Sequence, residues 1–140
     1  YLSRLSGPLL DRFDLHVEVP HVDYRTLLEA GRVGEPSAAV RQRVLTARKL
    51  QAKRAAQHGD AYGCNASLCP DQLQQVAALD ASAERLLLTY ARRHVLSSRA
   101  VHRVLRVART VADLADCPQL QAPHVAEALS LRALDRPMVM

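Results

Sequence analysis

The sequence predicts an all-α protein, a helical bundle preceded by a short strand. Its 140 residues suffice for one domain, and the 49% hydrophobic and 24% charged residues are typical of a globular chain that buries a core. The chain has no Trp and one Phe, so its apolar mass is Leu, Val and Ala, which suits close-packed helices better than a β-sandwich. Clear alternation of apolar and polar residues, the mark of a half-buried strand, occurs only over 14–19.

Proline and glycine residues divide the N-terminal part of the chain into short elements. These are a single helical turn over 7–13, the strand over 14–19, a short helix over 23–30 and a linker over 31–36. Five longer helices follow, delimited by capping residues and helix breakers. They are a long helix over 37–58, capped by Ser37 and stopped by Gly59, and helices over 70–79, 80–95, 98–116 and 123–134, with a loop over 60–69.

The helix over 98–116 gives the strongest support for a bundle. At 100° per residue its side chains divide into an apolar arc and an arginine stripe, as expected of an amphipathic helix with one face in the core. The arc holds Val104, Leu105, Val107, Ala108, Val111 and Ala112, and the stripe holds Arg99, Arg103, Arg106 and Arg109. Small residues that allow close approach of a second helix are Ala100, Ala108, Ala112 and Ala115.

The charge balance permits a polyanionic partner such as nucleic acid. Nineteen Lys and Arg stand against 14 Asp and Glu, giving a net charge of +5, and only Lys49 and Lys53 are lysine. No acidic residue occurs within 36–59 or within 85–112. An arginine bias also arises in GC-rich genomes, so both interpretations stay open. No apolar run approaches about 18 residues, so the sequence predicts no membrane-spanning segment.

The residues exclude several kinds of active site. No nucleophile–base pair, no His-x-x-x-His spacing and no Gly-rich phosphate loop is present in the sequence. Cys64 and Cys69 supply two of the four ligands that a structural zinc site needs, so we predict no metal site. Together with Cys117 they are expected to be free thiols in a reducing cytoplasm.

Arginine is the residue type in this sequence best suited to a functional role, because its planar guanidinium neutralises phosphate oxygens and stays protonated. Arg12 lies between a helical turn and a strand, where a side chain can project from the edge of a domain. Arg99 lies in the first turn of its helix, so its charge and the helix N-terminus favour the same anion. The alternative for each is a solvated or ion-paired arginine.

Four long segments of the chain resemble the C-terminal part of magnesium chelatase-like AAA+ ATPases. They are 5–20, which includes the Leu-Asp-Arg-Phe-Asp run, 43–54, 97–114 and 124–132. The similarity covers nearly the whole chain and is closest to the competence-associated ComM/YifB group. The chain does not start with Met and lacks that family's phosphate-binding loop and Walker acidic residues. We therefore expect it to be a C-terminal piece of a longer protein.

The resemblance implies three regions and a set of site residues. Residues 1–22 would end the AAA+ α/β core, 23–69 would hold linker helices including a long inserted helix, and 70–140 would form the C-terminal helical lid. Arg12 would be the arginine finger, which reaches the γ-phosphate of ATP on a neighbouring subunit, and Arg99 the sensor-two arginine. Candidates for contact with nucleic acid or the next subunit are Arg41, Arg48, Arg103 and Arg106.

The resemblance also implies cofactors and partners. The full-length protein would use ATP and Mg²⁺ in a homo-oligomeric ring, a hexamer, and the chain alone would bind no cofactor. ComM-like proteins are implied to be DNA motors that promote branch migration in natural transformation. One alternative is the ATPase subunit of magnesium chelatase. Another, of a different class, is a stand-alone basic helical module that binds nucleic acid.

Overall fold

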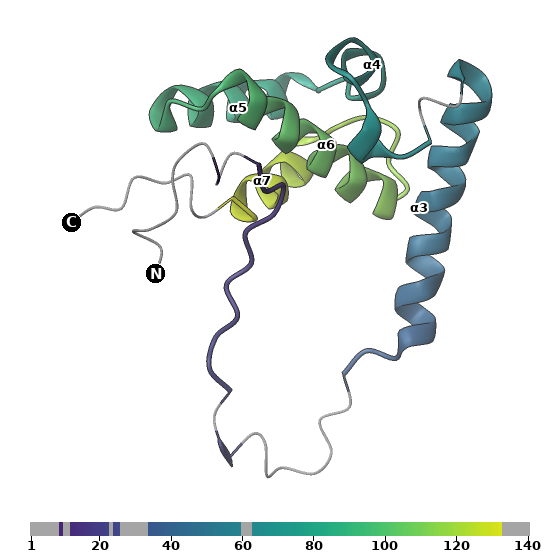
Figure 1. The fold of residues 1–140 in the computed structure, drawn as a ribbon, viewed down its shortest axis with the longest axis vertical. Helices are drawn as coiled ribbons and strands as arrows, with labels where there is room; N and C mark the ends of the chain where they lie inside the picture. The colour runs from purple at the N-terminus through teal and green to yellow at the C-terminus, as the bar shows by residue number, and fades with distance from the viewer. Residues whose placement is uncertain (1–8, 10–11, 23, 26–33, 60–62, 133–140) are drawn as a thin grey trace.

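The computed structural model describes residues 9, 12–22, 24–25, 34–59 and 63–132, and the predicted all-α fold is confirmed within them. The described elements are α3 (Ser37–His58), a 3₁₀ turn η3 (Asn65–Ser67), α4 (Pro70–Val76), α5 (Ala81–His94), α6 (Ser98–Leu114) and α7 (Ala122–Ser130). Figure 1 shows α4 to α7 gathered into one bundle, with α3 standing beside it and running away from it. We call these four helices the α4–α7 bundle.

Helix α6 lies at the centre of this bundle and packs against α7, α3, α4 and η3. Its buried apolar positions are Ala100, Val104, Ala108 and Ala112, each at most 1% exposed. Three of the small residues expected to face a second helix, Ala100, Ala108 and Ala112, are therefore in the core. Ala115 is exposed, because α6 ends before it at Leu114.

Local sequence sets the helix ends. Asp80 caps α5 by accepting hydrogen bonds from the backbone N–H groups of Ser82 and Ala83. Gly59 ends α3 with a φ of 103°, a backbone conformation that favours glycine. Ser37 is the first helical residue of α3 and not its cap, since Pro36 occupies the N-cap position without a side-chain hydrogen bond. Helices α4, α5 and α6 end one to three residues earlier than predicted, at Val76, His94 and Leu114. Helix α7 ends at Ser130, before the predicted end at 134.

Helix α3 has 22 residues but touches the bundle with only its C-terminal half. Ala47 and Gln51 are its buried residues, and every residue over 37–45 is exposed. Within the described part of the chain, no helix combines the length and apolar character needed to cross a bilayer.

The strand predicted over 14–19 is not formed in the described residues. His16 makes an isolated bridge to Arg132, and the side chains of Val17 and Val19 are 67% and 83% exposed. A strand needs a partner along its length, and here the segment after α7 supplies only one paired residue, Arg132, among the described residues. The short helix predicted over 23–30 and the turn over 7–13 lie mostly outside the described residues, although Tyr24 and Arg25 are helical.

Candidate functional site

The N-terminus of α6 presents Arg99 to solvent. Ser97 caps the helix, and its Oγ accepts a hydrogen bond of 3.1 Å from the backbone N–H of Ala100. Arg99 is the second residue of the helix and is exposed. The partial positive charge of the helix N-terminus and the guanidinium of Arg99 therefore act on the same region of solvent.

A shallow groove of about 360 Å³ follows this first turn of α6. Its lining residues are Ser98, Arg99, His102, Arg103 and Arg106. Three of the five carry a permanent positive charge, because guanidinium groups do not deprotonate in proteins. The groove is thus suited to an anion with several oxygens, such as a phosphate chain.

Two of the groove arginines are held by contacts within the chain. Arg106 donates from Nε and Nη2 to the carbonyl oxygen of Leu68, at 3.0 and 2.7 Å. Arg103 forms an ion pair with the Asp14 carboxylate at 2.5 Å. Each of these two side chains is therefore connected to another part of the chain.

Arg12 lies in the segment that brings Asp14 to this groove. Its side chain is exposed, and its backbone N–H donates to the carbonyl of Leu9 at 3.0 Å, closing a turn. Two residues later, Asp14 makes the ion pair with Arg103. The Asp14–Arg103 ion pair therefore connects the segment that carries Arg12 to the helix that carries Arg99.

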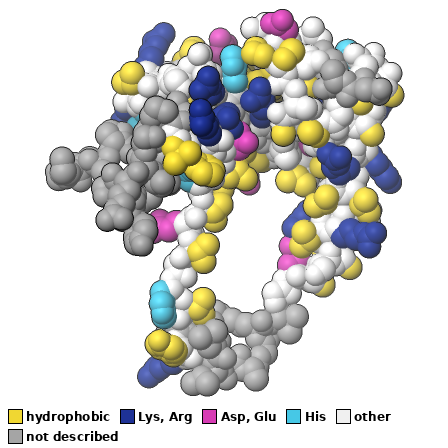
Figure 2. Space-filling view, viewed as in Figure 1, with side chains coloured by type: hydrophobic (Ala, Val, Ile, Leu, Met, Phe, Trp, Pro, Cys, Tyr) yellow, Lys and Arg dark blue, Asp and Glu magenta, His cyan; other side chains and the backbone are white. Residues whose placement is uncertain are grey.

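The candidate contact residues of α3 lie apart from this groove. Arg41 and Arg48 are both exposed, and Arg48 donates to Oε1 of Gln51 at 2.8 Å. Arg43, which is also exposed, pairs through both Nη atoms with Glu35. Figure 2 shows Lys and Arg side chains along α3, so the helix presents a basic surface to solvent.

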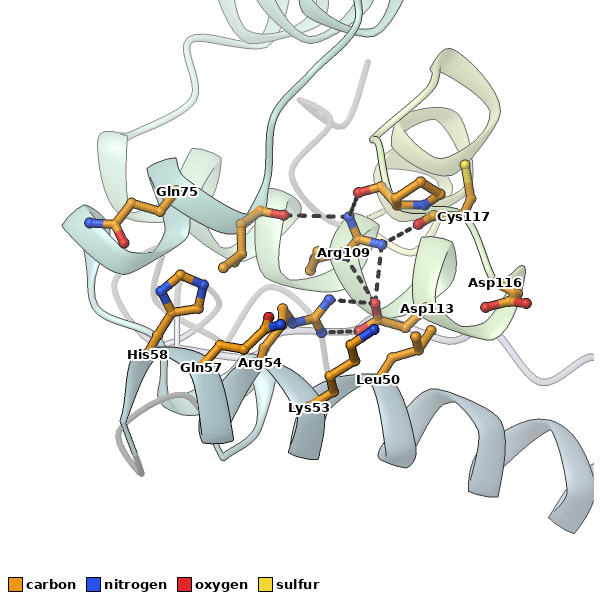
Figure 3. Close-up of a pocket in the computed structure, with 12 residues that line it drawn as sticks. Leu50, Lys53, Arg54, Gln57, His58, Gln75, Arg109, Asp113, Asp116 and Cys117 are labelled. Carbon is orange, nitrogen blue, oxygen red and sulfur yellow. Dashed lines mark hydrogen bonds and ion pairs between the residues drawn. The ribbon is translucent and has the colours of Figure 1, made fainter.

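Arg109 does not belong to the exposed arginine stripe that the sequence predicts. It is 1% exposed and lies at the wall of a cleft of about 370 Å³ between α3 and the bundle (Figure 3). Its guanidinium donates to the backbone carbonyls of Cys117 and Pro118 at 2.5 and 2.7 Å. The prediction of an exposed Arg109 is wrong because α3 and the turn after α6 cover this end of the helix.

Asp113 is the carboxylate that joins α3 to α6, and sequence reasoning missed it. It is fully buried and accepts a bidentate pair of hydrogen bonds from Arg54 on α3, at 2.7 and 2.5 Å. It also accepts from Nδ2 of Asn65 at 2.8 Å and from Nε of Arg109 at 3.1 Å. The sequence did contain a signal for this ion pair, because Arg109 and Asp113 have opposite charges and lie four residues apart on one helix.

Burial and partners act in opposite directions on the pKa values of this cluster. Burial alone would raise the pKa of Asp113, but the hydrogen bonds from Arg54 and Asn65 and the charge of Arg109 outweigh it and leave the pKa lowered. Burial lowers the pKa of Arg109, and the Asp113 charge opposes that shift. The carboxylate is therefore held in its ionised form between two guanidinium groups.

The cysteines and histidines do not assemble a metal centre in the described part of the chain. The three cysteines are free thiols. Within the described ranges, no three His, Cys, Asp or Glu side chains gather where a metal ion would bind. Cys64 has a lowered pKa because its thiol and backbone contacts with Ser67 favour the thiolate.

Comparison with known proteins identifies the family. Residues 34–132 match the family described as magnesium chelatase, subunit ChlI C-terminal, and residues 1–27 match magnesium chelatase, subunit ChlI. The chain belongs to the magnesium chelatase family. Within that family it is ComM- and YifB-like, as the relatives below show.

This magnesium chelatase family member is 43% identical over 136 residues to competence protein ComM of Haemophilus influenzae, which covers 97% of the chain and 26% of ComM. It is 41% identical over 140 residues to YifB of Escherichia coli, covering 99% of the chain and 26% of YifB. It is 39% identical over 139 residues to YifB of Salmonella typhimurium, again with 99% and 26% covered. The chain spans about a quarter of the length of these curated relatives.

The two magnesium chelatase matches divide the candidate site between them. Arg12 falls in the match over 1–27, and Arg99 falls in the match over 34–132. The ion pair between Asp14 and Arg103 crosses from one matched part to the other. The site is therefore shared by both parts of the family match.

Proposed function

We propose that this chain forms the lid and the trans-acting edge of an oligomeric AAA+ ATPase that works on DNA. The observation that carries the proposal is the groove at the start of α6, where Arg99, Arg103 and Arg106 line one surface beside a capped helix N-terminus. Such a surface favours the negative charge of a nucleotide's phosphates. The magnesium chelatase family of the chain supports the same proposal.

In this proposal each arginine has a separate task. Arg99 contacts nucleotide phosphate as the sensor-two arginine, and Arg12 reaches the γ-phosphate of ATP bound on a neighbouring subunit. A fixed positive charge at that position stabilises the charge that develops on the transferring phosphoryl group. ATP is the substrate here. The described residues gather no carboxylate cluster for Mg²⁺, so the proposal assigns this chain no Mg²⁺ ligand.

The name of its ComM relative supports a role in competence, and the basic surface of α3 supports DNA as the partner. Arg41 and Arg48 on that helix would contact DNA phosphates or the adjacent subunit. The ATPase subunit of magnesium chelatase is the alternative within the family. We favour the ComM-like role because the ComM and YifB relatives match 97% and 99% of this chain.

Subunit mixing in a full-length protein that carries this chain tests the proposal. Arg12→Ala should reduce ATP hydrolysis by about 10³-fold or more, while ATP binding changes little. A second variant that lacks the phosphate-loop lysine should also be inactive. A mixture of the two should recover activity, because each supplies at the shared interface what the other lacks. If both variants assemble and mixing restores nothing, Arg12 does not act on a neighbour's nucleotide.

A further inference from the structure

The backbone that follows Arg12 is docked against the end of the α4–α7 bundle. The carbonyl of Phe13 accepts a hydrogen bond of 2.8 Å from Nη1 of Arg132, whose side chain is fully buried. Three residues later, the backbone N–H of His16 donates to the carbonyl of Leu131 at 2.6 Å, and His16 is also buried. Two backbone groups on either side of Asp14 are therefore fixed to the residues that follow α7.

The Asp14 side chain ties the same segment to α6. It pairs with Arg103, which lies four residues, about one helical turn, after Arg99. The Arg103 side chain is 18% exposed and the Asp14 side chain is 51% exposed, so this ion pair lies at the surface of the bundle. Arg12, two residues before Asp14, is thus linked through Arg103 to the helix that carries Arg99.

We propose that the lid positions the arginine finger of its own subunit, with Arg132 and Arg103 as the positioning residues for Arg12. This inference rests on the proposed function, because Arg12 is a finger only if the protein hydrolyses ATP at a subunit interface. A finger is effective when its guanidinium is already held where charge develops. Fixing the backbone at Phe13 and His16 removes conformational freedom next to Arg12 before the neighbour's ATP arrives.

The coupling has a mechanical consequence. The bonded groups at positions 13, 14 and 16 follow the bundle when it turns, and Arg12 adjoins them. A movement of α6 that brings Arg99 toward a nucleotide therefore also moves Arg12. One subunit would present both arginines together, or withdraw both together.

Exchange of backbone hydrogens tests the docking in the 140-residue chain without any assay of activity. The His16 N–H should be protected by its bond to Leu131. Arg132→Met, which keeps a long apolar side chain but removes the donor to Phe13, should speed its exchange at least tenfold. Arg132→Lys keeps one donor and should restore protection. Unchanged exchange in Arg132→Met would overturn the role of Arg132 in docking.

Steady-state kinetics in the full-length protein test the positioning. Arg132→Met and Asp14→Ala should lower kcat by about tenfold to a hundredfold, as expected of a group displaced by about 1 Å. The KM for ATP should stay within about twofold, because the finger acts on the transition state. Arg132→Lys and Asp14→Glu should recover most of the rate. Glu35→Gln, which breaks the exposed pair with Arg43, is the matched control and should leave kcat unchanged.

The outcomes separate this inference from the proposed function. If the unmodified full-length protein hydrolyses no ATP, the proposed function fails and the inference fails with it, whereas the exchange result still reports on docking. If the protein hydrolyses ATP and Arg132→Met frees the His16 amide without lowering kcat, the inference alone is overturned. A fall in kcat that neither Arg132→Lys nor Asp14→Glu relieves would also overturn it.

Discussion

Arg109 and Asp113 lie four residues apart on α6, are both fully buried, and form an ion pair of 3.1 Å in the bundle. The same carboxylate receives both Nη atoms of Arg54 from α3. A single carboxylate therefore pairs with two guanidinium groups from two helices. Removing it would leave the Arg109 charge buried, because that guanidinium otherwise contacts neutral carbonyl groups.

Asp113→Ala should be strongly destabilising. Loss of one partner of a buried ion pair leaves an uncompensated charge and costs about 3–5 kcal/mol. We expect the free energy of unfolding in urea to fall by this amount. Asp116→Asn is the matched control, because Asp116 is exposed and its φ of 52° suits Asn. A loss below about 1 kcal/mol in Asp113→Ala would show that the cluster does not hold α3 on the bundle.

Stability should fall at acidic pH in part through Asp113. Its pKa in the folded chain is below the ordinary value of 3.8, so the ionised form is favoured by folding. This contribution is fully present above the unfolded pKa and is lost as pH falls through the lower folded pKa. Asp113→Asn should therefore flatten the dependence of the unfolding free energy on pH below about 4.

Asp80 contributes to the same acid-sensitive range, since hydrogen bonds from Ser82 and from the backbone of Ala83 lower its pKa. The flattening in Asp113→Asn should therefore be partial, and Asp80→Asn added to it should flatten the profile further. An acid profile of Asp113→Asn that matches the unmodified chain would contradict the assignment.

Ser97→Ala should weaken the start of α6. The lost cap leaves the N–H of Ala100 without its side-chain acceptor and costs about 0.5–2 kcal/mol in the free energy of unfolding. The adjacent change Ser98→Ala, inside the helix, is the control and should have a smaller effect. Equal losses in the two variants would argue against the cap. Urea titrations of both variants measure the difference.

His16→Leu should be neutral or stabilising. Both ring nitrogens of His16 are buried and have no hydrogen-bond partner among the described residues. Burial of such atoms costs free energy, which an apolar side chain of similar size avoids. Thermal unfolding should show an unchanged or higher melting temperature, while exposed His21→Leu should show no gain. A clear loss in His16→Leu would mean that the imidazole is needed at this position.

DNA binding by the chain, if the proposed basic surface of α3 is used, should be weak, indifferent to sequence and steeply dependent on salt. Arg41→Gln and Arg48→Gln should each reduce the slope of log K against log salt by about 0.9, the value for one phosphate contact. Arg85→Gln, at an exposed position of α5, is the control. Tight binding that survives high salt and prefers one sequence would instead support a stand-alone nucleic-acid module.

The sequence was sufficient for the helices because their signals are local. Pro70 as a first residue and Gly59 as a stop each act within one turn, and the structure confirms both. The alternation over 14–19 was also a local signal, but a strand depends on a distant partner. In the described residues that partner is a single position, Arg132.

The same distinction applies to the site. A helical wheel places Arg99 and Arg109 on one side of α6 but cannot show that α3 and the turn after α6 cover one end of that side. Arg99 is therefore exposed beside a groove, whereas Arg109 is in the core. The covering helix α3 lies more than 40 residues earlier in the chain than these arginines.

The N-terminal part of α3, over 37–45, makes no buried contact with the described residues. The helix is anchored from Ala47 onward, and its first ten residues extend about 15 Å beyond that anchor, at 1.5 Å per residue. A tilt of about 10° at the anchor therefore moves the free end by about 2.6 Å. Because Arg54 and Asp113 join this part of α3 to α6, we expect a small rotation of the bundle to produce a larger displacement at the exposed N-terminal end of α3.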